Sequence, residues 1–284
     1  MNLGQLWDEL ATDLEREFRT YRSRLKNLSI SVKPDKTLLT EADIAIENMI
    51  IDRIRQVDPQ SVVVAEEDGR TAVRKDVLDN PRRIWVIDPI DGTAEFVKPQ
   101  GREFCSVVCL LENLIPVAAF ILAPELGRGS APLLITAVPD FPAITVNGRD
   151  AGRRASGGGD RWVSVTRSQN EPARAFEPGL AHLGYSLKTR TTSQTLDMVR
   201  TAVDMSDFTD PPLPQFELFM RCEQKAWDGL AGLCLGRVAK LVSRDAEGND
   251  RLPVNVNTLS QPEPAFSSTI MGDEELVSWL LQQI

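Results

Sequence analysis

The stretch WVIDPIDGTAEF, residues 85–96, changes character twice over a short distance. An apolar run rich in β-branched residues ends at Asp88, a proline turn follows, and Asp91 then opens a segment that is typical of a helix start. The apolar run predicts a buried strand that ends abruptly in acidic residues. The Asp, Pro and Gly residues of the pattern D-P-x-D-G also favour tight turns, so an ordinary turn without a ligand is the alternative interpretation.

The two carboxylates of this stretch are three residues apart and face one point in the predicted turn. Such oxygen ligands suit a hard cation such as Mg²⁺, and the backbone carbonyl of Ile90, freed by the turn, is a further candidate ligand. The amides of Gly92 and Thr93, at the start of the predicted helix, are donors that suit a phosphate group. The stretch therefore predicts metal and anion contacts in one place.

Two further acidic sites lie far from this stretch in the sequence. Glu66 and Glu67 follow the apolar run SVVVA as Asp88 follows its own strand, so adjacent parallel strands would bring these acids to one ligand-binding edge. Asp228 follows Trp227 at the start of an otherwise apolar predicted helix, where a carboxylate needs a compensating partner. Glu66 and Asp228 are therefore candidate metal ligands. For each of them, a solvated acid or a charge at a helix N-terminus is the alternative.

Two amphipathic helices are predicted before the central strand. A long N-terminal helix is predicted from an apolar stripe at steps of three and four, formed by Leu3, Leu6, Leu10, Leu14, Phe18, Tyr21 and Leu25. A second helix is predicted to begin at Thr40, whose hydroxyl caps it with Asp43 at the third helical position, and to end at Asp58. The predicted buried face of the second helix consists of Ile44, Met49, Ile50, Ile54 and Val57.

The rest of the chain alternates between strand and helix patterns, which predicts a mixed α/β fold. Strands are predicted in FCSVVCLL, IPVAAFIL, LLITAV, AITVNG, RWVSVTRSQ, FELFMRC and VAKLVS, and helices at 171–183, at 194–205, in AWDGLAGLCLG and around Leu276 to Leu280. The loop-like stretch GRDAGRRASGGGD, residues 148–160, predicts a boundary between an N-terminal part, 1–150, and a C-terminal part, 151–284. The first part carries most of the candidate ligands, and the second supplies Asp228 and substrate contacts.

The composition excludes several classes of function. A net charge of −9, from 41 acidic and 32 basic residues, disfavours nucleic-acid polymers and anionic lipids as partners. His182 is the one histidine, so multi-histidine zinc sites are excluded and a nucleophile has a single candidate histidine base. No segment approaches the ~20 apolar residues of a membrane span, and the N-terminus has no signal-peptide pattern. The four cysteines lack a C-x-x-C pair and are typical of core thiols, so we expect a cytoplasmic protein.

Three separated motifs together resemble the signature of the inositol monophosphatase superfamily of metal-dependent, often lithium-sensitive phosphatases. They are Glu66-Glu67, D-P-I-D-G-T from Asp88 to Thr93, and W-D at Trp227-Asp228, with Lys33 and T-E-A-D at Thr40 to Asp43 in addition. The resemblance covers most of residues 30–125 and 160–245. It implies an α-β-α-β-α sandwich and the hydrolysis of a small phosphate monoester by water, with two or three Mg²⁺ ions or with Mn²⁺ in their place.

The resemblance also implies a role for each matching residue. The implied metal ligands are Glu66, Asp88, the Ile90 carbonyl, Asp91 and Asp228. Thr93, oriented by Asp43, would help to activate the nucleophilic water, and the amides of Gly92 and Thr93 would bind the phosphate. A metal-activated water needs neither a histidine nor a covalent nucleophile, in agreement with the single histidine of the chain. Helix capping remains the alternative role for Asp43.

Several residues of the matching motifs bear on the substrate. Members of the superfamily that act on inositol phosphate usually carry a glutamate seven residues before the W-D aspartate, where this chain has Arg221. The strings D-G-T-A-E-F and V-T-R-S-Q are more similar to the branch that removes the 3′-phosphate from adenosine bisphosphate, although Ala65 stands where Gly or Ser is usual. Arg221 and Ser168 are therefore candidate substrate contacts. Arg221 would face a second phosphate, or else pair with Glu217 or Glu223. Histidinol phosphate and fructose bisphosphate are alternative substrates.

A non-catalytic regulator that binds metal or phosphate on the same fold is the rival interpretation, because a fold does not fix a function. No ligand position of the motif is lost, which weighs against this rival. The glycine-rich signatures of dinucleotide and nucleoside triphosphate sites are absent from the sequence. The expected partner is a small phosphorylated metabolite, with no nucleic-acid polymer and no membrane. The resemblance adds the expectation of a homodimer.

Overall fold

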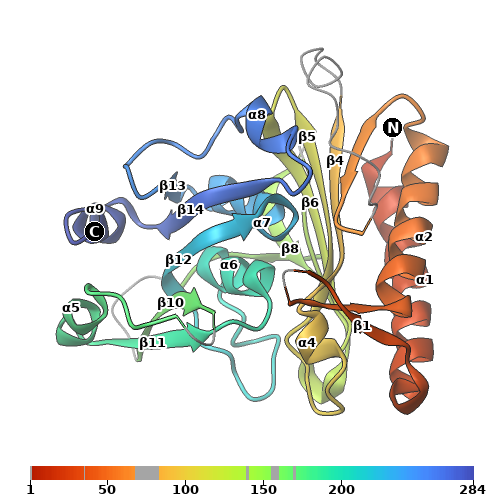
Figure 1. The fold of residues 1–284 in the computed structure, drawn as a ribbon, viewed down its shortest axis with the longest axis horizontal. Helices are drawn as coiled ribbons and strands as arrows, with labels where there is room; N and C mark the ends of the chain where they lie inside the picture. Colours follow the sequence, from red (N-terminus) through yellow and green to blue (C-terminus); the bar gives the residue numbers. More distant parts are fainter. Residues whose placement is uncertain (1, 35, 68–82, 139–140, 155–159, 169–170) are drawn as a thin grey trace.

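Five layers of secondary structure stack across the molecule in the order α-β-α-β-α (Figure 1). The computed structural model describes residues 2–34, 36–67, 83–138, 141–154, 160–168 and 171–284. The helix pairs of the three α layers, from one side to the other, are α1 (Leu3–Ser23) with α2 (Glu41–Val57), α6 (Gln194–Ala202) with α7 (Ala226–Val238), and α5 (Glu177–His182) with α9 (Glu274–Leu281). The architecture confirms the α/β class and the predicted sandwich.

Within the described residues, the larger sheet has seven strands whose spatial order follows the chain. They are β3 (Val62–Ala65), β4 (Ile84–Asp91), β5 (Cys105–Glu112), β6 (Ile115–Ala123), β7 (Leu133–Val138), β8 (Phe141–Val146) and β9 (Arg149–Ala151). β4 and β5 are buried at almost every position because helices cover both faces of the sheet, which explains their continuous apolar runs. β3 and β4 run parallel in register, so Glu66 and Asp88 emerge at the same edge, as predicted.

The outer helices α1 and α2 bury one apolar stripe each against this sheet. The stripe of α1 includes the predicted Leu6, Leu10, Leu14, Phe18 and Tyr21, and also Trp7, which was not predicted. The predicted members Leu3 and Leu25 are only partly buried. On α2 the buried stripe runs at steps of four residues through Ala42, Ile46, Ile50 and Ile54. This spacing turns Ile44 and Val57 outward, where they are 40% and 39% exposed, so the prediction that these two residues are buried is wrong.

The second sheet has five strands and packs on the opposite side of α6 and α7. Its order is β11 (Tyr185–Arg190), β10 (Arg161–Arg167), β12 (Phe216–Lys225), β14 (Ala265–Gly272) and β13 (Val242–Arg244). The small residues of α7 permit close packing between the two sheets. A Cβ added at Gly232 would lie 2.5 Å from Met198 Sδ, so a larger residue would force α6 and α7 apart.

Several predicted elements differ from the structure in extent. The predicted helix at 171–183 shortens to α5, which begins beside Pro178 as proline's preference for the first helical turn favours. The predicted strand VAKLVS starts only at Val242, because α7 continues to Val238. The predicted loop at 148–160 contains strand β9, and its residues 155–159 lie outside the described residues. Strands β11 and β14 and the short helix α8 (Val256–Leu259) were not predicted.

Both predicted parts contribute to one apolar core around α7, which contacts strands of each sheet. The change from one sheet to the other falls between Ala151 and Arg161, whereas the division into parts 1–150 and 151–284 stays a prediction.

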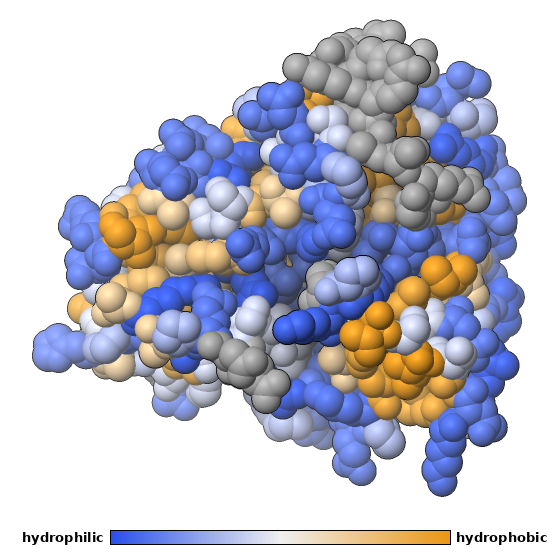
Figure 2. Space-filling view, viewed as in Figure 1, coloured by the Kyte–Doolittle hydropathy of each residue, from blue (hydrophilic) through white to orange (hydrophobic). Residues whose placement is uncertain are grey.

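All four cysteines are free thiols, and Cys222 alone among them is partly exposed. Across the described ranges, no helix is both long and apolar enough to cross a membrane. Figure 2, which has the same view as Figure 1, shows that this side of the molecule is hollowed at its centre, where hydrophilic residues gather.

Candidate metal centre

Three aspartates from two distant parts of the chain lie together between the sheets. Asp88 and Asp91 come from the end of β4, and Asp228 comes from the first turn of α7. One carboxylate oxygen of each lies within 4.8 Å of the others, and the residues are 1%, 6% and 8% exposed. The pairing of β4 with β5 shifts register between Asp88 and Asp91, and such irregularities redirect side chains at the end of a strand. The structure thus brings three of the predicted ligands to one point.

Burial raises the pKa of all three carboxyl groups. For Asp88 and Asp228, burial and then the charges of neighbouring acids raise the pKa well above its ordinary value. The pKa of Asp91 rises to about 6, because burial outweighs the hydrogen bonds that favour its charged form. Asp88 Oδ1 is buried and accepts no hydrogen bond from any residue that the structure describes. A buried set of carboxylates with an unsatisfied oxygen fits the ligand preference of Mg²⁺.

Glu66 and Glu67 lie beside the three aspartates and share a lysine. Lys33 follows β1 (Ile30–Val32) in its hairpin with β2 (Leu38–Thr40), and its Nζ lies 2.7 Å from Glu66 Oε1 and 2.5 Å from Glu67 Oε1. Within the described residues, the close metal-ligand cluster contains the three aspartates without Glu66. Burial and the charge of Glu66 raise the pKa of Glu67 to about 7, against the opposite effect of Lys33. In this structure, Lys33 is therefore the positive charge next to Glu66, the role that the predicted cation would otherwise have.

The hydroxyl of Thr93 connects the turn to helix α2. Thr93 Oγ1 lies 3.0 Å from the carbonyl oxygen of Ile90 and 3.3 Å from Asp43 Oδ1, and it can donate its proton to one of them at a time. The other oxygen of Asp43 accepts hydrogen bonds from the amide and hydroxyl of Thr40, which forms the predicted cap. Burial is the main reason why the pKa of Asp43 rises to about 6. The geometry of Asp43 therefore suits a helix cap and a partner of Thr93 at once.

Gly92 occupies a position that other residues do not tolerate. Its φ is 93°, and an added Cβ would lie 2.9 Å from the carbonyl oxygen of Glu103 and 3.3 Å from the Cα of Phe104. The short helix α4 (Thr93–Phe96) follows directly, so the amides of Gly92 and Thr93 lie at its first turn. Their binding of a phosphate stays a prediction.

Arg221 and Ser168 lie at the second sheet, on β12 and just after β10. Arg221 Nη1 donates to Thr191 Oγ1 at 3.2 Å, and burial lowers the pKa of Arg221 although Glu171 and Asp228 favour its charge. Among the described residues, Arg221 forms an ion pair with neither Glu217 nor Glu223, so the alternative of a pair with these neighbours is not borne out. Glu217 instead accepts from Arg161 and Tyr185, which are nearer to it across the sheet. The role of Arg221 as a substrate contact stays a prediction. Ser168 is exposed, and its amide donates to Glu171 Oε2.

The first turn of α6 donates hydrogen bonds to two of the three aspartates, Asp91 and Asp228. These contacts were not predicted from the sequence. Asp91 Oδ2 accepts from the Ser193 hydroxyl at 2.6 Å and from the Thr195 amide at 2.7 Å. The side-chain amide of Gln194 donates to Asp228 Oδ2 at 2.7 Å. The string S-Q-T before a predicted helix was a signal for a cap, but nothing in the sequence indicates which acid it faces.

The raised pKa values of the aspartates predict a pH-dependent effect of Mg²⁺ on stability. A carboxyl group whose pKa is higher in the folded state lowers stability as the pH rises above its unfolded pKa, near 3.9, because the folded state then binds more protons. A cation that pairs with the charged cluster removes this cost at neutral pH and must displace protons at pH 5. Saturating Mg²⁺ is expected to raise Tm by about 5–10 °C at pH 7.5 and by less at pH 5.

Scanning fluorimetry at both pH values, with Mg²⁺ or EDTA, measures this difference. Comparing the two additives at each pH cancels the titration of groups outside the centre. An equal Mg²⁺ effect at both pH values would contradict the role of the aspartates.

Curated proteins and solved structures provide an independent comparison. The chain is 34% identical over 106 residues to the 3′(2′),5′-bisphosphate nucleotidase CysQ of Buchnera aphidicola, and 35% identical over 111 residues to the histidinol-phosphatase of Streptomyces coelicolor. These alignments cover 37% and 38% of this chain, and they span only 38% and 39% of the two relatives.

The similarity to solved structures, unlike the sequence alignments, extends over the whole chain. The extragenic suppressor protein suhB from Bartonella henselae superposes with a TM-score of 0.76 over 100% of this chain and 98% of that one, at 18% identity. The model of the inositol monophosphatase family matches residues 6–268, which include the larger sheet, most of the second sheet and all three clustered aspartates. The chain therefore belongs to the inositol monophosphatase family.

Proposed function

We propose that the protein is a Mg²⁺-dependent phosphatase that hydrolyses a small phosphate monoester with water. The observation that carries this proposal is the buried cluster of Asp88, Asp91 and Asp228 with its unsatisfied oxygen. Three buried carboxylates are costly without a cation, and a fold that maintains them gains most when a cation binds. Family membership and the partial likeness to CysQ support the same reaction.

We assign Asp88, Asp91, Asp228, Glu66 and the Ile90 carbonyl as the groups that hold two or three Mg²⁺ ions, with Mn²⁺ as an alternative. When bound, Mg²⁺ would lower the pKa of a water and neutralise charge on the phosphate oxygens. Glu66 would contribute through its Oε2, or through Oε1 if the ion replaced Lys33 there.

Thr93 and Asp43 are proposed to position and deprotonate the attacking water. Thr93 Oγ1 would accept the proton of the water and donate its own to Asp43 Oδ1, from which it is 3.3 Å away. A pKa of about 6 suits Asp43 as a base, because it remains charged at neutral pH and still accepts a proton readily. The amides of Gly92 and Thr93 would bind the phosphate at the start of α4.

The proposed substrate carries a second anionic group, with adenosine 3′,5′-bisphosphate as the leading candidate. Arg221 is largely buried, is influenced by the charge of Asp228, and leaves its Nε without a partner among the described residues. A buried guanidinium without a paired carboxylate suits a phosphate of the substrate. Ser168 is a second proposed substrate contact. Histidinol phosphate, fructose 1,6-bisphosphate and inositol 1-phosphate are the alternatives.

Replacing Arg221 by methionine is expected to affect a bisphosphate more than a monophosphate. Arg221→Met removes the charge and keeps a long apolar stem, so KM for adenosine 3′,5′-bisphosphate should rise about 10–100-fold, the effect of losing a charged hydrogen bond of 1.5–3 kcal/mol. KM for a monophosphate should change by less than about threefold. Steady-state kinetics with both substrates measures the ratio, and an equal change for the two would contradict the second-anion contact.

Phosphate release from a panel of these four substrates, each with Mg²⁺ or EDTA, tests the proposed function. Turnover of one member that EDTA abolishes is the expected result. Mg²⁺ binding without turnover of any member would favour the second candidate, a non-catalytic regulator that binds metal or phosphate, for which the intact metal cluster is equally suitable.

We propose a small phosphorylated metabolite as the partner, with neither a nucleic-acid polymer nor a membrane, together with a cytoplasmic location and a homodimer. Light scattering of the purified protein measures the oligomeric state, and a monomer would contradict that part.

A further inference from the structure

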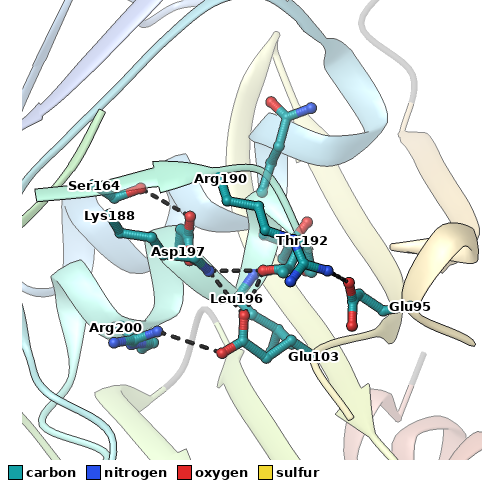
Figure 3. Close-up of polar contacts among 12 residues, drawn as sticks. Glu95, Glu103, Ser164, Lys188, Arg190, Thr192, Leu196, Asp197 and Arg200 are labelled. Atoms are coloured by element: carbon teal, nitrogen blue, oxygen red, sulfur yellow. Dashed lines mark hydrogen bonds and ion pairs between the residues drawn. The ribbon is translucent and has the colours of Figure 1, made fainter. Parts of the chain in front are cut away.

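A network of hydrogen bonds around Lys188 contacts the start of α6, the helix whose first turn donates hydrogen bonds to Asp91 and Asp228. Figure 3 shows Lys188 of β11 among Glu103, Thr192 and Asp197. Lys188 Nζ donates to Asp197 Oδ1 at 2.6 Å, to Thr192 Oγ1 at 2.7 Å and to Glu103 Oε2 at 2.9 Å. A lysine has three donors, so the whole donor capacity of Lys188 is used inside the protein.

The partners of Lys188 lie on either side of the first turn of α6. Thr192 directly precedes the helix cap Ser193, and Asp197 lies one turn further along the helix. Asp197 is 1% exposed and accepts a second hydrogen bond from Ser164 Oγ at 2.8 Å, so its carboxylate is fixed from two strands. Lys188 therefore donates a hydrogen bond at each end of the first turn of α6, to Thr192 and to Asp197.

Glu103 connects this network to the strand beside Asp91. It lies two residues before Cys105, the residue that pairs with Asp91 between β5 and β4. Glu103 also accepts a hydrogen bond from the Thr192 hydroxyl, and Arg200 Nη1 lies 3.8 Å from its other oxygen. The contacts close a ring that runs from Asp91 through Glu103 and the Lys188–Thr192 pair to α6, and back to Asp91 through Ser193 and Thr195.

We propose that Lys188 is a positioning residue for the metal centre. It touches none of the three clustered aspartates, but it sets the place of the α6 turn, whose donors orient Asp91 and Asp228. Removing a group that orients a metal ligand without binding the metal typically weakens metal affinity about 10–100-fold. The inference rests on the proposed metal site and adds to it residues that bind no ion.

Mg²⁺ affinity, measured by calorimetry on the full-length protein, tests the role of Lys188 without any need for turnover. Lys188→Met is expected to weaken Mg²⁺ binding about 10–100-fold, and Lys188→Arg is expected to recover part of the loss. Because Lys188→Met removes the hydrogen-bonding cation of the buried Asp197 and of Glu103 and risks unfolding, Thr192→Val provides a milder second variant. It keeps the branched shape and removes only the hydroxyl, and we expect a loss of about tenfold.

Arg153→Met is the control, because it breaks an ion pair with Asp273, the residue before α9, and because Arg153 forms no hydrogen bond or ion pair with the first turn of α6 among the described residues. The control is expected to lower Tm while Mg²⁺ affinity stays within about twofold of the wild type. Unchanged Mg²⁺ affinity in a folded Thr192→Val protein would overturn the positioning role while leaving the proposed function intact. A wild-type protein that binds no Mg²⁺ would overturn both.

Discussion

Asp91→Asn is expected to lower the rate of phosphate release by a factor on the order of 10³ or more, because it removes a metal ligand from the reacting centre. The substitution also replaces an oxygen that accepts two hydrogen bonds from the first turn of α6. We expect Mg²⁺ affinity to fall about 100-fold, and the Mg²⁺-dependent rise in Tm to shrink with it. Phosphate release and calorimetric titration of Mg²⁺ measure the two effects on the same preparation.

Asp13→Asn is the control for this prediction, since it removes a carboxylate of similar burial on α1. Asp13 accepts from Arg53 on the outer face of the molecule, far along the chain from the cluster. The control should lower stability and leave the Mg²⁺ dependence of the rate unchanged. If Asp91→Asn retained the wild-type rate and Mg²⁺ dependence, the assignment of the metal ligands would be wrong.

Thr93→Ala is expected to slow turnover about 100–1,000-fold while Mg²⁺ affinity changes little. The hydroxyl of Thr93 lies between Asp43 and the Ile90 carbonyl, so its removal breaks the proposed proton path from the attacking water. Loss of a positioned proton-transfer group typically costs 10²–10⁴-fold in rate. Because Thr93 is not among the clustered carboxylates, kcat should fall with no matching change in the Mg²⁺ titration.

Two matched substitutions separate the hydroxyl from the shape of the side chain. Thr93→Ser keeps the hydroxyl and should retain most of the rate. Thr93→Val keeps the branched shape and should be as slow as Thr93→Ala. A Val variant as fast as the wild type would show that the hydroxyl takes no part in the reaction.

Much of the candidate site could be predicted from the sequence because its acids follow strands and open helices. Apolar runs identified β3 and β4, and their parallel pairing brings Glu66 and Asp88 to one edge of the sheet. The cap at Thr40 identified the start of α2 and thereby the place of Asp43. Local patterns of this kind have a direct physical cause, namely backbone hydrogen bonding and burial of one face.

The contacts that support the site could not be predicted, because they join residues far apart in the chain. Ser193 contacts Asp91 across 102 positions, and Lys188 contacts Glu103 across 85. Strand β11, YSLKTR, alternates polar and apolar residues weakly and lies at the edge of its sheet, where burial imposes little pattern. Glu217, an alternative partner of Arg221 judged by its nearness in sequence, instead pairs with Arg161 on the next strand.

Anomalous diffraction from crystals soaked in Mn²⁺ tests the central claim most directly, because Mn²⁺ scatters strongly and prefers the same oxygen ligands as Mg²⁺. The expected result is at least one peak within about 2.5 Å of carboxylate oxygens of Asp88, Asp91 and Asp228. Well-ordered, fully soaked crystals with no peak at these three aspartates would contradict the assignment of this cluster as a metal centre.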